Sequence, residues 1–145
     1  MVPVTKRRAM WRTPVLPRVL LVEDDRRSHQ LLRQILVEGG WDVISAMTQA
    51  SGLAGIDCDP DCVILDLGLP DGGGEAILEK IRSERLAVRV AVMTAEGDPE
   101  RLHRVAALEP DLFLSKPIDL PELIRWLDLP VPRIWGAAQL TGSMN

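Results

Sequence analysis

Residues 18–40 read RVLLVEDDRRSHQLLRQILVEGG, and this stretch decides the fold. Its apolar run, Val19 to Val22, has the length and the β-branched content of a strand buried on both faces, as in a parallel sheet. Acidic residues follow, and apolar residues then recur at helical spacing from Arg26 to Glu38, where Gly39-Gly40 ends the helix. The stretch therefore predicts a strand, an acidic turn and a helix in succession.

The same alternation continues along the chain. Further strands are predicted at 41–46, 62–65, 88–93 and 112–114, and further helices at 48–56, at 75–82, from Pro99 and from Leu120. Asp98-Pro99 is a typical helix start, and Asp119 with Glu122 resembles a capping box. Five strands that alternate with five helices predict an α/β fold: a parallel sheet with helices on both faces and right-handed crossovers.

Composition narrows the class of protein further. The chain has 145 residues, of which 46% are hydrophobic and 26% charged, as expected for one globular domain. Its apolar runs are far shorter than the about 20 residues that cross a bilayer, and no secretory signal is recognisable. With Cys58 and Cys62 as its only cysteines, the chain is expected in a reducing, cytoplasmic compartment.

Charge is distributed unevenly. Residues 1–18 contain five basic and no acidic side chains, whereas the remainder contains 12 basic and 21 acidic ones. We interpret 1–17 as a solvated basic tail, with contact to nucleic acid or anionic lipid as the alternative. The acidic body, 18–128, argues against a general nucleic-acid binder, and 129–145 is interpreted as a second tail.

Reactive side chains stand where the predicted strands end. In a parallel sheet the ligand site lies at the carboxyl ends of the strands. We therefore expect three or four carboxylates, a hydroxyl and an ammonium group to meet in one crevice. They belong to Glu23, Asp24 and Asp25 after the first strand, Asp66 after the third, Thr94 after the fourth, and Lys116 after the fifth.

Such a set of groups predicts a specific chemistry. Crowded carboxylates repel one another, so one must protonate unless a cation lies among them, and a hard cation with oxygen ligands indicates Mg²⁺. A carboxylate that remains free as a nucleophile can accept a phosphoryl group. The metal and the lysine would neutralise the charge on the phosphoryl oxygens.

Four motifs together resemble the receiver domain of response regulators in bacterial two-component signalling. They are VEDD at 22–25, ILDLGLPD at 64–71, MTA at 93–95 and SKP at 115–117, and the resemblance covers about 18–128. It implies a flavodoxin-like doubly wound sheet with strand order 2-1-3-4-5. It also implies that Asp66 is the phospho-acceptor, and that Glu23, Asp24, Asp66 and the carbonyl of Gly68 hold Mg²⁺.

The resemblance assigns the switch as well. It implies that Thr94 supplies the switch hydroxyl, that Lys116 pairs with the phosphoryl oxygens, and that the bond from Lys116 to Pro117 is often cis. Phe113 occupies the aromatic switch position, where the family often has tyrosine. Because a phenylalanine ring has no hydroxyl to keep at the surface, we expect it to be turned inward even without phosphorylation.

Two departures leave the lifetime of the phosphoryl group open. Gly68 replaces a side chain that usually shields the acyl phosphate. Glu96, two residues after Thr94, is acidic and can either help or hinder the attacking water.

We predict a stand-alone response regulator that takes its phosphoryl group from a histidine kinase or a histidine phosphotransfer protein. It would signal through protein contacts on the surface 99–127, with no DNA-binding output domain and no membrane span, and it would catalyse only its own phosphorylation and dephosphorylation. Association into a homodimer stays open.

Three alternatives remain. The first is a phosphorelay shuttle or phosphate sink without a switched target. The second is an aspartyl phosphatase, which needs a second acid where Gly68 stands. The third is a receiver-like partner that binds without phosphorylation.

Overall fold

The sheet has five parallel strands, and their order is the predicted one. β1 (Arg18–Val22), β2 (Asp42–Ala46), β3 (Cys62–Asp66), β6 (Arg89–Thr94) and β7 (Leu112–Ser115) lie in the order β2-β1-β3-β6-β7. Counted within the sheet, this is 2-1-3-4-5. β3 is central and buried along its whole length, as its continuous apolar sequence requires. The computed structural model describes residues 16–95 and 97–127; most of the two predicted tails, and Glu96, lie outside that range.

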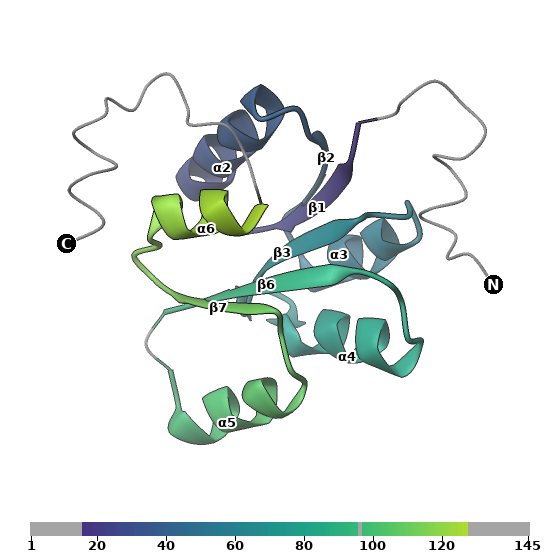
Figure 1. The fold of residues 1–145 in the computed structure, drawn as a ribbon. Helices are drawn as coiled ribbons and strands as arrows, with labels where there is room; N and C mark the ends of the chain where they lie inside the picture. The colour runs from purple at the N-terminus through teal and green to yellow at the C-terminus, as the bar shows by residue number, and fades with distance from the viewer. Residues whose placement is uncertain (1–15, 96, 128–145) are drawn as a thin grey trace.

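Five helices cover the two faces of the sheet (Figure 1). They are α2 (Arg26–Glu38), α3 (Gln49–Ile56), α4 (Glu75–Ser83), α5 (Pro99–Ala107) and α6 (Leu120–Leu127). α2 and α6 pack on one face, and α3, α4 and α5 on the other. Two predicted helix starts are confirmed, because the carboxylates of Asp98 and Asp119 accept backbone N–H groups of Glu100 and Glu122.

Alternate residues of the central strands feed two separate cores. In β1, Val19 and Leu21 pack with α2 and α6, whereas Leu20 and Val22 face α3 and α4. α3 reaches the sheet through its glycines. A Cβ placed on Gly55 would lie only 2.5 Å from Cδ1 of Leu20, so any larger residue would push the helix away. The glycines that weaken this helix in isolation therefore allow its close packing.

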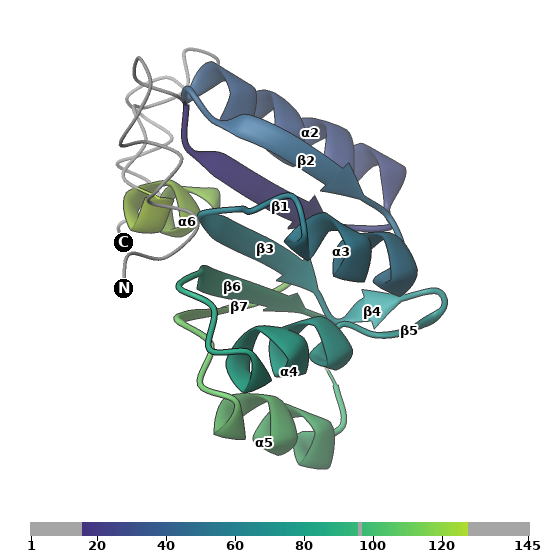
Figure 2. The same ribbon diagram turned by 90° about the vertical axis from the view of Figure 1, so that its right-hand side faces the viewer.

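The turn after Asp66 is ordered. β4 (Gly68–Leu69) and β5 (Gly72–Gly73) form a short antiparallel pair there (Figure 2). The Asp71 carboxylate accepts the backbone N–H groups of Gln49 and Ala50 at 2.6 and 3.0 Å. This bond to the first turn of α3 fixes the turn by a contact distant in sequence, which local turn preferences do not reveal.

Helices in the described part of the chain are all too short or too polar to cross a membrane.

Candidate functional site

Three acidic residues meet at the carboxyl ends of β1 and β3. Glu23 and Asp24 directly follow β1, Asp66 ends β3, and these two strands are neighbours in the sheet. A carboxylate oxygen from each of the three lies within 4.8 Å of the others. Glu23 is fully buried and Asp66 is 3% exposed, whereas Asp24 is exposed at the mouth of the cluster. The structure thus brings together the acids that the strand-end pattern selected.

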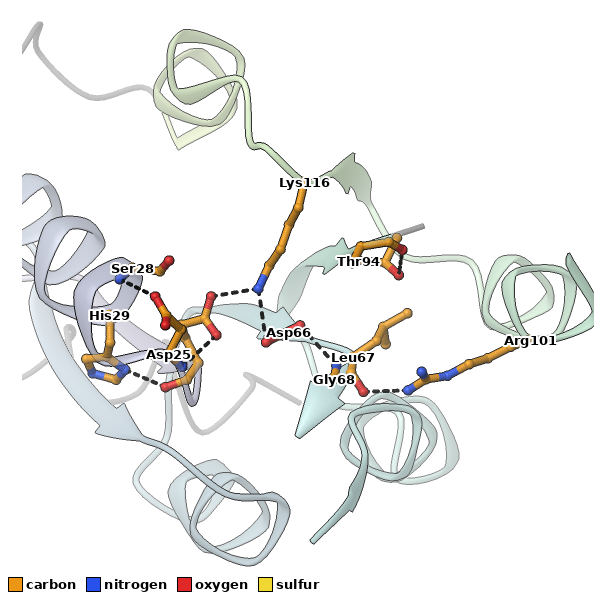
Figure 3. A network of polar contacts seen from close by, with 11 residues as sticks. Asp25, Ser28, His29, Asp66, Leu67, Gly68, Thr94, Arg101 and Lys116 are labelled. Atoms are coloured by element: carbon orange, nitrogen blue, oxygen red, sulfur yellow. Dashed lines mark hydrogen bonds and ion pairs between the residues drawn. The ribbon is translucent and has the colours of Figure 1, made fainter. Parts of the chain in front are cut away.

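Lys116 enters the cluster from the segment after β7. Its Nζ donates to Glu23 Oε1 at 2.9 Å and to Asp66 Oδ2 at 3.1 Å (Figure 3). The backbone N–H of Lys116 donates to the Thr94 carbonyl at 2.7 Å, so the lysine is held at the end of β6 as well. The bond from Lys116 to Pro117 is cis, in agreement with the resemblance.

The electrostatics of the cluster follow from burial and from this single ammonium group. Burial, together with the adjacent Asp66, raises the pKa of Glu23 to about 7 despite the bond from Lys116. Burial alone would raise the pKa of Asp66 too, but hydrogen bonds from Glu23, Gly68 and Lys116 outweigh it and leave that pKa lowered. The pKa of Lys116 is raised, because its two carboxylate partners outweigh the effect of burial. The pKa of Asp66 is thus lowered and that of Glu23 raised, so Asp66 is the more readily ionised of the two carboxyl groups.

These residues fit a hard divalent cation. The three groups supply only oxygen ligands, as Mg²⁺ prefers. Burial and the nearby Asp66 raise the pKa of Glu23, and a neutralising cation among the carboxylates would offset both effects. Gly68 places no side chain beside the acceptor, and a Cβ built there would meet only Asp66 Oδ1, at 3.7 Å.

Asp25 does not join the three acids. Its carboxylate caps α2 by accepting the Ser28 N–H at 2.9 Å, and its own N–H donates to Glu23 Oε2 at 3.2 Å.

Thr94 lies at the end of β6, directly after Met93, which pairs with Asp66 across the sheet. Its side chain is 7% exposed, and its hydroxyl donates to the Ala95 carbonyl at 2.7 Å. The hydroxyl is thus close to the acidic cluster in the fold but is engaged by its own backbone.

Phe113 corrects an expectation. Its side chain is 37% exposed, so the prediction that it turns inward is wrong for this structure. β7 is an edge strand, and its alternation places Leu114 in the core with α2 and α6 while Phe113 faces the side of α5. α5 buries Val105 as its one core residue and leaves this ring uncovered.

Sequence reasoning missed two contacts to this site. His29 is buried, and its Nδ1 lies 2.9 Å from the Glu23 carbonyl. Arg101 donates to both carboxylate oxygens of Glu75, at 2.7 and 2.8 Å, and to the carbonyl of Leu67. In the sequence Arg101 resembles any polar residue of an amphipathic helix, and its partners are 26 and 34 residues away.

A pocket of about 200 Å³ opens beside Lys116, between α2 and the segment after β7. Apolar side chains form much of its wall, and Leu31 among them is 41% exposed. The lining residues are Ser28, Leu31, Leu32, Lys116, Pro117, Ile118 and Leu120.

Known proteins share this sequence pattern and this fold. The chain is 40% identical over 108 residues to the KDP operon transcriptional regulatory protein KdpE of Escherichia coli, a match covering 72% of this chain and 47% of that protein. The chain spans about half the length of the curated relatives that it matches.

Solved structures agree with these relatives. The signal receiver domain of a LuxO repressor protein from Vibrio parahaemolyticus superposes with a TM-score of 0.70 at 28% identity, covering 90% of this chain and 94% of that one. A CheY-like response regulator receiver domain from Methanospirillum hungatei reaches a TM-score of 0.73 at 25% identity, covering 90% and 98%. Residues 19–128 match the response regulator receiver domain as a family. Through these residues the chain belongs to the response regulator receiver domain family.

Proposed function

We propose that Asp66 accepts a phosphoryl group from a phosphohistidine of a histidine kinase or a histidine phosphotransfer protein. The observation that carries the proposal is the state of this carboxylate. Its lowered pKa keeps it charged, and Lys116 Nζ and the Gly68 N–H donate to its two oxygens. Gly68 adds no side chain beside it. A charged and oriented carboxylate is what a nucleophile for phosphorus requires.

The transfer exchanges one bond for another. An oxygen of Asp66 forms a bond to phosphorus while the N–P bond of the phosphohistidine breaks, and the electron pair of that bond stays on the imidazole nitrogen. Lys116, already 3.1 Å from Asp66 Oδ2, pairs with the charge on the phosphoryl oxygens. Glu23, Asp24 and Asp66, with the Gly68 carbonyl, would hold Mg²⁺, which neutralises the same charge when bound. In this proposal the domain catalyses its own phosphorylation and dephosphorylation and acts on no other substrate.

The donor protein has a docking place beside the acceptor. The pocket next to Lys116 has apolar walls, and Leu31 exposes 41% of its side chain there. Exposed apolar surface beside a reactive group is typical of a protein-binding site. We propose that the donor seats on this pocket and presents its histidine toward Asp66.

The response would arise at Thr94 and spread along the surface formed by α5, β7 and α6. A phosphoryl group adds a charge of about −1.5 to −2 and strong acceptor oxygens. The Thr94 hydroxyl would give up its bond to the Ala95 carbonyl and donate to the phosphoryl group instead. Space beside β7 would then be released, and the exposed ring of Phe113 would turn into it. This is a shift between two populations, limited by how differently the phosphoryl group interacts with each.

The target would be a protein that binds this surface. Relatives such as KdpE are named as transcriptional regulators and are about twice as long as the matched stretch. A cytoplasmic location is part of this proposal.

Intact-mass spectrometry tests the acceptor. With acetyl phosphate and Mg²⁺, the wild-type protein should gain one phosphoryl group, and Asp66→Asn should gain none. Asp57→Asn is the matched control. That carboxylate follows the last turn of α3, is 79% exposed, and forms only a weak ion pair with Lys80. Labelling of Asp66→Asn at the wild-type level would refute the assignment.

Beryllofluoride with Mg²⁺, which mimics the phosphoryl group, separates a switch from a shuttle. We expect amide shifts to spread through α5, β7 and α6, and Thr94→Ala to reduce them. Shifts confined to the acidic cluster would favour the phosphorelay shuttle.

A further inference from the structure

Arg101 reaches from the first turns of α5 to the segment that follows the phospho-acceptor. Its Nε and Nη2 donate to the two carboxylate oxygens of Glu75, and Nη2 also donates to the Leu67 carbonyl. Figure 3 shows Arg101 and Lys116 approaching this segment from different sides. Arg101 is 31% and Glu75 21% exposed, so the network is partly shielded from water. The guanidinium therefore links α5, α4 and the acceptor segment in one place.

The Leu67 carbonyl belongs to the same peptide group as the Gly68 N–H. A peptide group is planar, so fixing its carbonyl also fixes the direction of its N–H. The Gly68 N–H donates to Asp66 Oδ1 at 3.0 Å. A continuous chain of hydrogen bonds thus runs from Arg101 through one peptide group to the acceptor carboxylate.

The surrounding loop is built closely around this chain. The Leu67 carbonyl also accepts the Gly74 N–H at 3.2 Å, so both of its lone pairs are used. A Cβ at Gly74 would lie 2.5 Å from the backbone oxygen of Asp66, and a Cβ at Gly73 would overlap the Glu75 carboxylate. Gly73 therefore keeps free the space of the ion pair, and Gly74 allows the loop to pass close to the backbone of Asp66.

We infer that Arg101 is a positioning residue that orients the Asp66 carboxylate through the Leu67–Gly68 peptide group and couples its state to α5. The guanidinium polarises the carbonyl, and a polarised peptide group donates a stronger hydrogen bond from its N–H. The residue touches no reacting atom, and its effect passes through the peptide. The inference deepens the proposed function and rests on it for the coupling to phosphorylation.

The coupling works in both directions. A phosphoryl group on Asp66 changes the acceptor that the Gly68 N–H meets, so the bond from Arg101 to the other end of the peptide changes with it. Conversely, a contact that pulls on α5 alters the orientation of the acceptor. Equilibrium coupling between two sites is necessarily reciprocal.

The amide proton resonance of Gly68 tests the positioning in the unmodified protein. The amide proton of a polarised peptide group that donates to a charged carboxylate resonates downfield. Arg101→Gln removes the polarising guanidinium and should move the Gly68 resonance upfield. Arg104→Gln is the matched control, since it removes an exposed arginine from the same helix and should leave Gly68 unchanged. Equal Gly68 shifts in Arg101→Gln and Arg104→Gln would overturn the inference. This measurement needs neither metal nor phosphate, so it is independent of whether Asp66 accepts a phosphoryl group.

Two further variants keep the test decisive if Arg101→Gln does not fold. Arg101→Lys retains one donor that can reach the Leu67 carbonyl but cannot also bind both oxygens of Glu75, so the Gly68 resonance should move upfield from its wild-type position. Glu75→Gln leaves the guanidinium in place and should move Gly68 less than Arg101→Lys does. A shift in Glu75→Gln as large as that in Arg101→Lys would assign the effect to the ion pair and overturn the inference.

Binding of beryllofluoride tests the coupling. With saturating Mg²⁺, Arg101→Gln should weaken its affinity about three- to twentyfold, as expected for a residue along a physical coupling path. The amide shifts that it induces in α5 should shrink, while those near Lys116 persist. Wild-type affinity together with undiminished α5 shifts in Arg101→Gln would overturn the coupling. Failure of the wild-type protein to bind beryllofluoride would instead refute the proposed function.

Discussion

Helices α2 and α5 both follow strands that end in site residues, yet the sheet holds them very differently. α2 buries four side chains, His29, Leu32, Ile35 and Leu36, along its 13 residues. α5, which like α2 lies wholly within the described residues, buries Val105 alone. Polar contacts, above all those of Arg101, also tie it to neighbouring elements.

The difference separates two tasks. The half of the site next to α2 holds Glu23 and Asp24, whose charges must be kept in place for a metal and an acceptor. The half next to α5 holds Thr94 and would report the change in charge. A segment with few buried apolar contacts opens and shifts at lower free-energy cost than a well-packed one. From this comparison we expect the half around Glu23 and Asp24 to be the more rigid one, and the half around α5 to open at a lower free-energy cost.

Truncation of buried apolar side chains should show the difference between α2 and α5 most strongly. Leu36 is 1% exposed, and Leu36→Ala should lower the free energy of unfolding by about 2 to 5 kcal/mol. Val105→Ala should cost about 1.5 to 2.5 kcal/mol and act mainly on α5. Urea unfolding measures both costs, and hydrogen exchange should show local opening of α5 in Val105→Ala alone. Global exchange in both variants would mean that the two helices are equally integrated.

Binding of Mg²⁺ should increase the difference between the two halves, because it stabilises the half that holds Glu23 and Asp24. A hundredfold excess over Kd stabilises the folded state by about 2.7 kcal/mol, because the ion binds only that state. The melting temperature should rise, and Asp24→Asn should remove most of the rise while leaving the metal-free protein at least as stable, since it relieves repulsion. Asp57→Asn is the control. A melting temperature indifferent to millimolar Mg²⁺ would contradict the metal site.

The ion pair of Glu75 provides a pH-dependent test of the α5 half. Hydrogen bonds from Arg101 hold the pKa of Glu75 below its usual value despite partial burial. The folded state therefore binds this proton less readily than the unfolded state does. The resulting stability is fully present above the ordinary glutamate pKa, and it is lost as the pH falls through the lowered folded value.

Glu75→Gln should accordingly cost about 0.5 to 1.5 kcal/mol at neutral pH, reduced by solvent screening at a partly exposed site. The difference from wild type should close in acid. Urea unfolding at neutral and at acidic pH measures this difference in the free energy of unfolding. Glu79→Gln, on the exposed side of α4, is the control. A gap that widened in acid would contradict the assigned direction of the pKa shift.

Truncation of Phe113 should have the smallest effect. Because 37% of the side chain is already exposed, Phe113→Ala should lower the free energy of unfolding by about 1 kcal/mol or less, compared with about 3 to 5 for a buried ring. Phe113→Tyr should be nearly neutral. A loss of the size typical of a buried ring would place the side chain inside, and the α5 half would then be better packed than the structure indicates.

Most of the fold could be predicted from local patterns in the sequence. The apolar run of β1 and the helical spacing of α2 are properties of neighbouring residues, and the helix starts at Asp98 and Asp119 are set by side chains two or three residues from the groups they cap. The acidic cluster was predictable for the same reason, because each acid directly follows a strand and parallel strands end at one edge of the sheet.

Contacts between distant residues were not predictable in this way. The close packing of α3 on the sheet depends on the short distance between Gly55 and Leu20. The ordered turn after Asp66 depends on the Asp71 carboxylate, which accepts backbone N–H groups from the first turn of α3. The prediction that the Phe113 ring turns inward was wrong. It was based on the missing hydroxyl group, which does not determine how much of the ring the adjacent helix covers.

Periodicity and strand-end chemistry were thus sufficient for the order of elements, the fold class and the membership of Glu23, Asp24, Asp66 and Lys116 in one site. Tertiary structure decided the environments of the two buried carboxylates, since Glu23 is fully buried while Asp66, beyond its local bond from the Gly68 N–H, shares Lys116 with Glu23. It also decided that Arg101 reaches the peptide group beside the acceptor. These bonds from Arg101 and Lys116 span 34 or more residues, so they depend on the packing of the whole sheet, and no pattern along the chain encodes them locally.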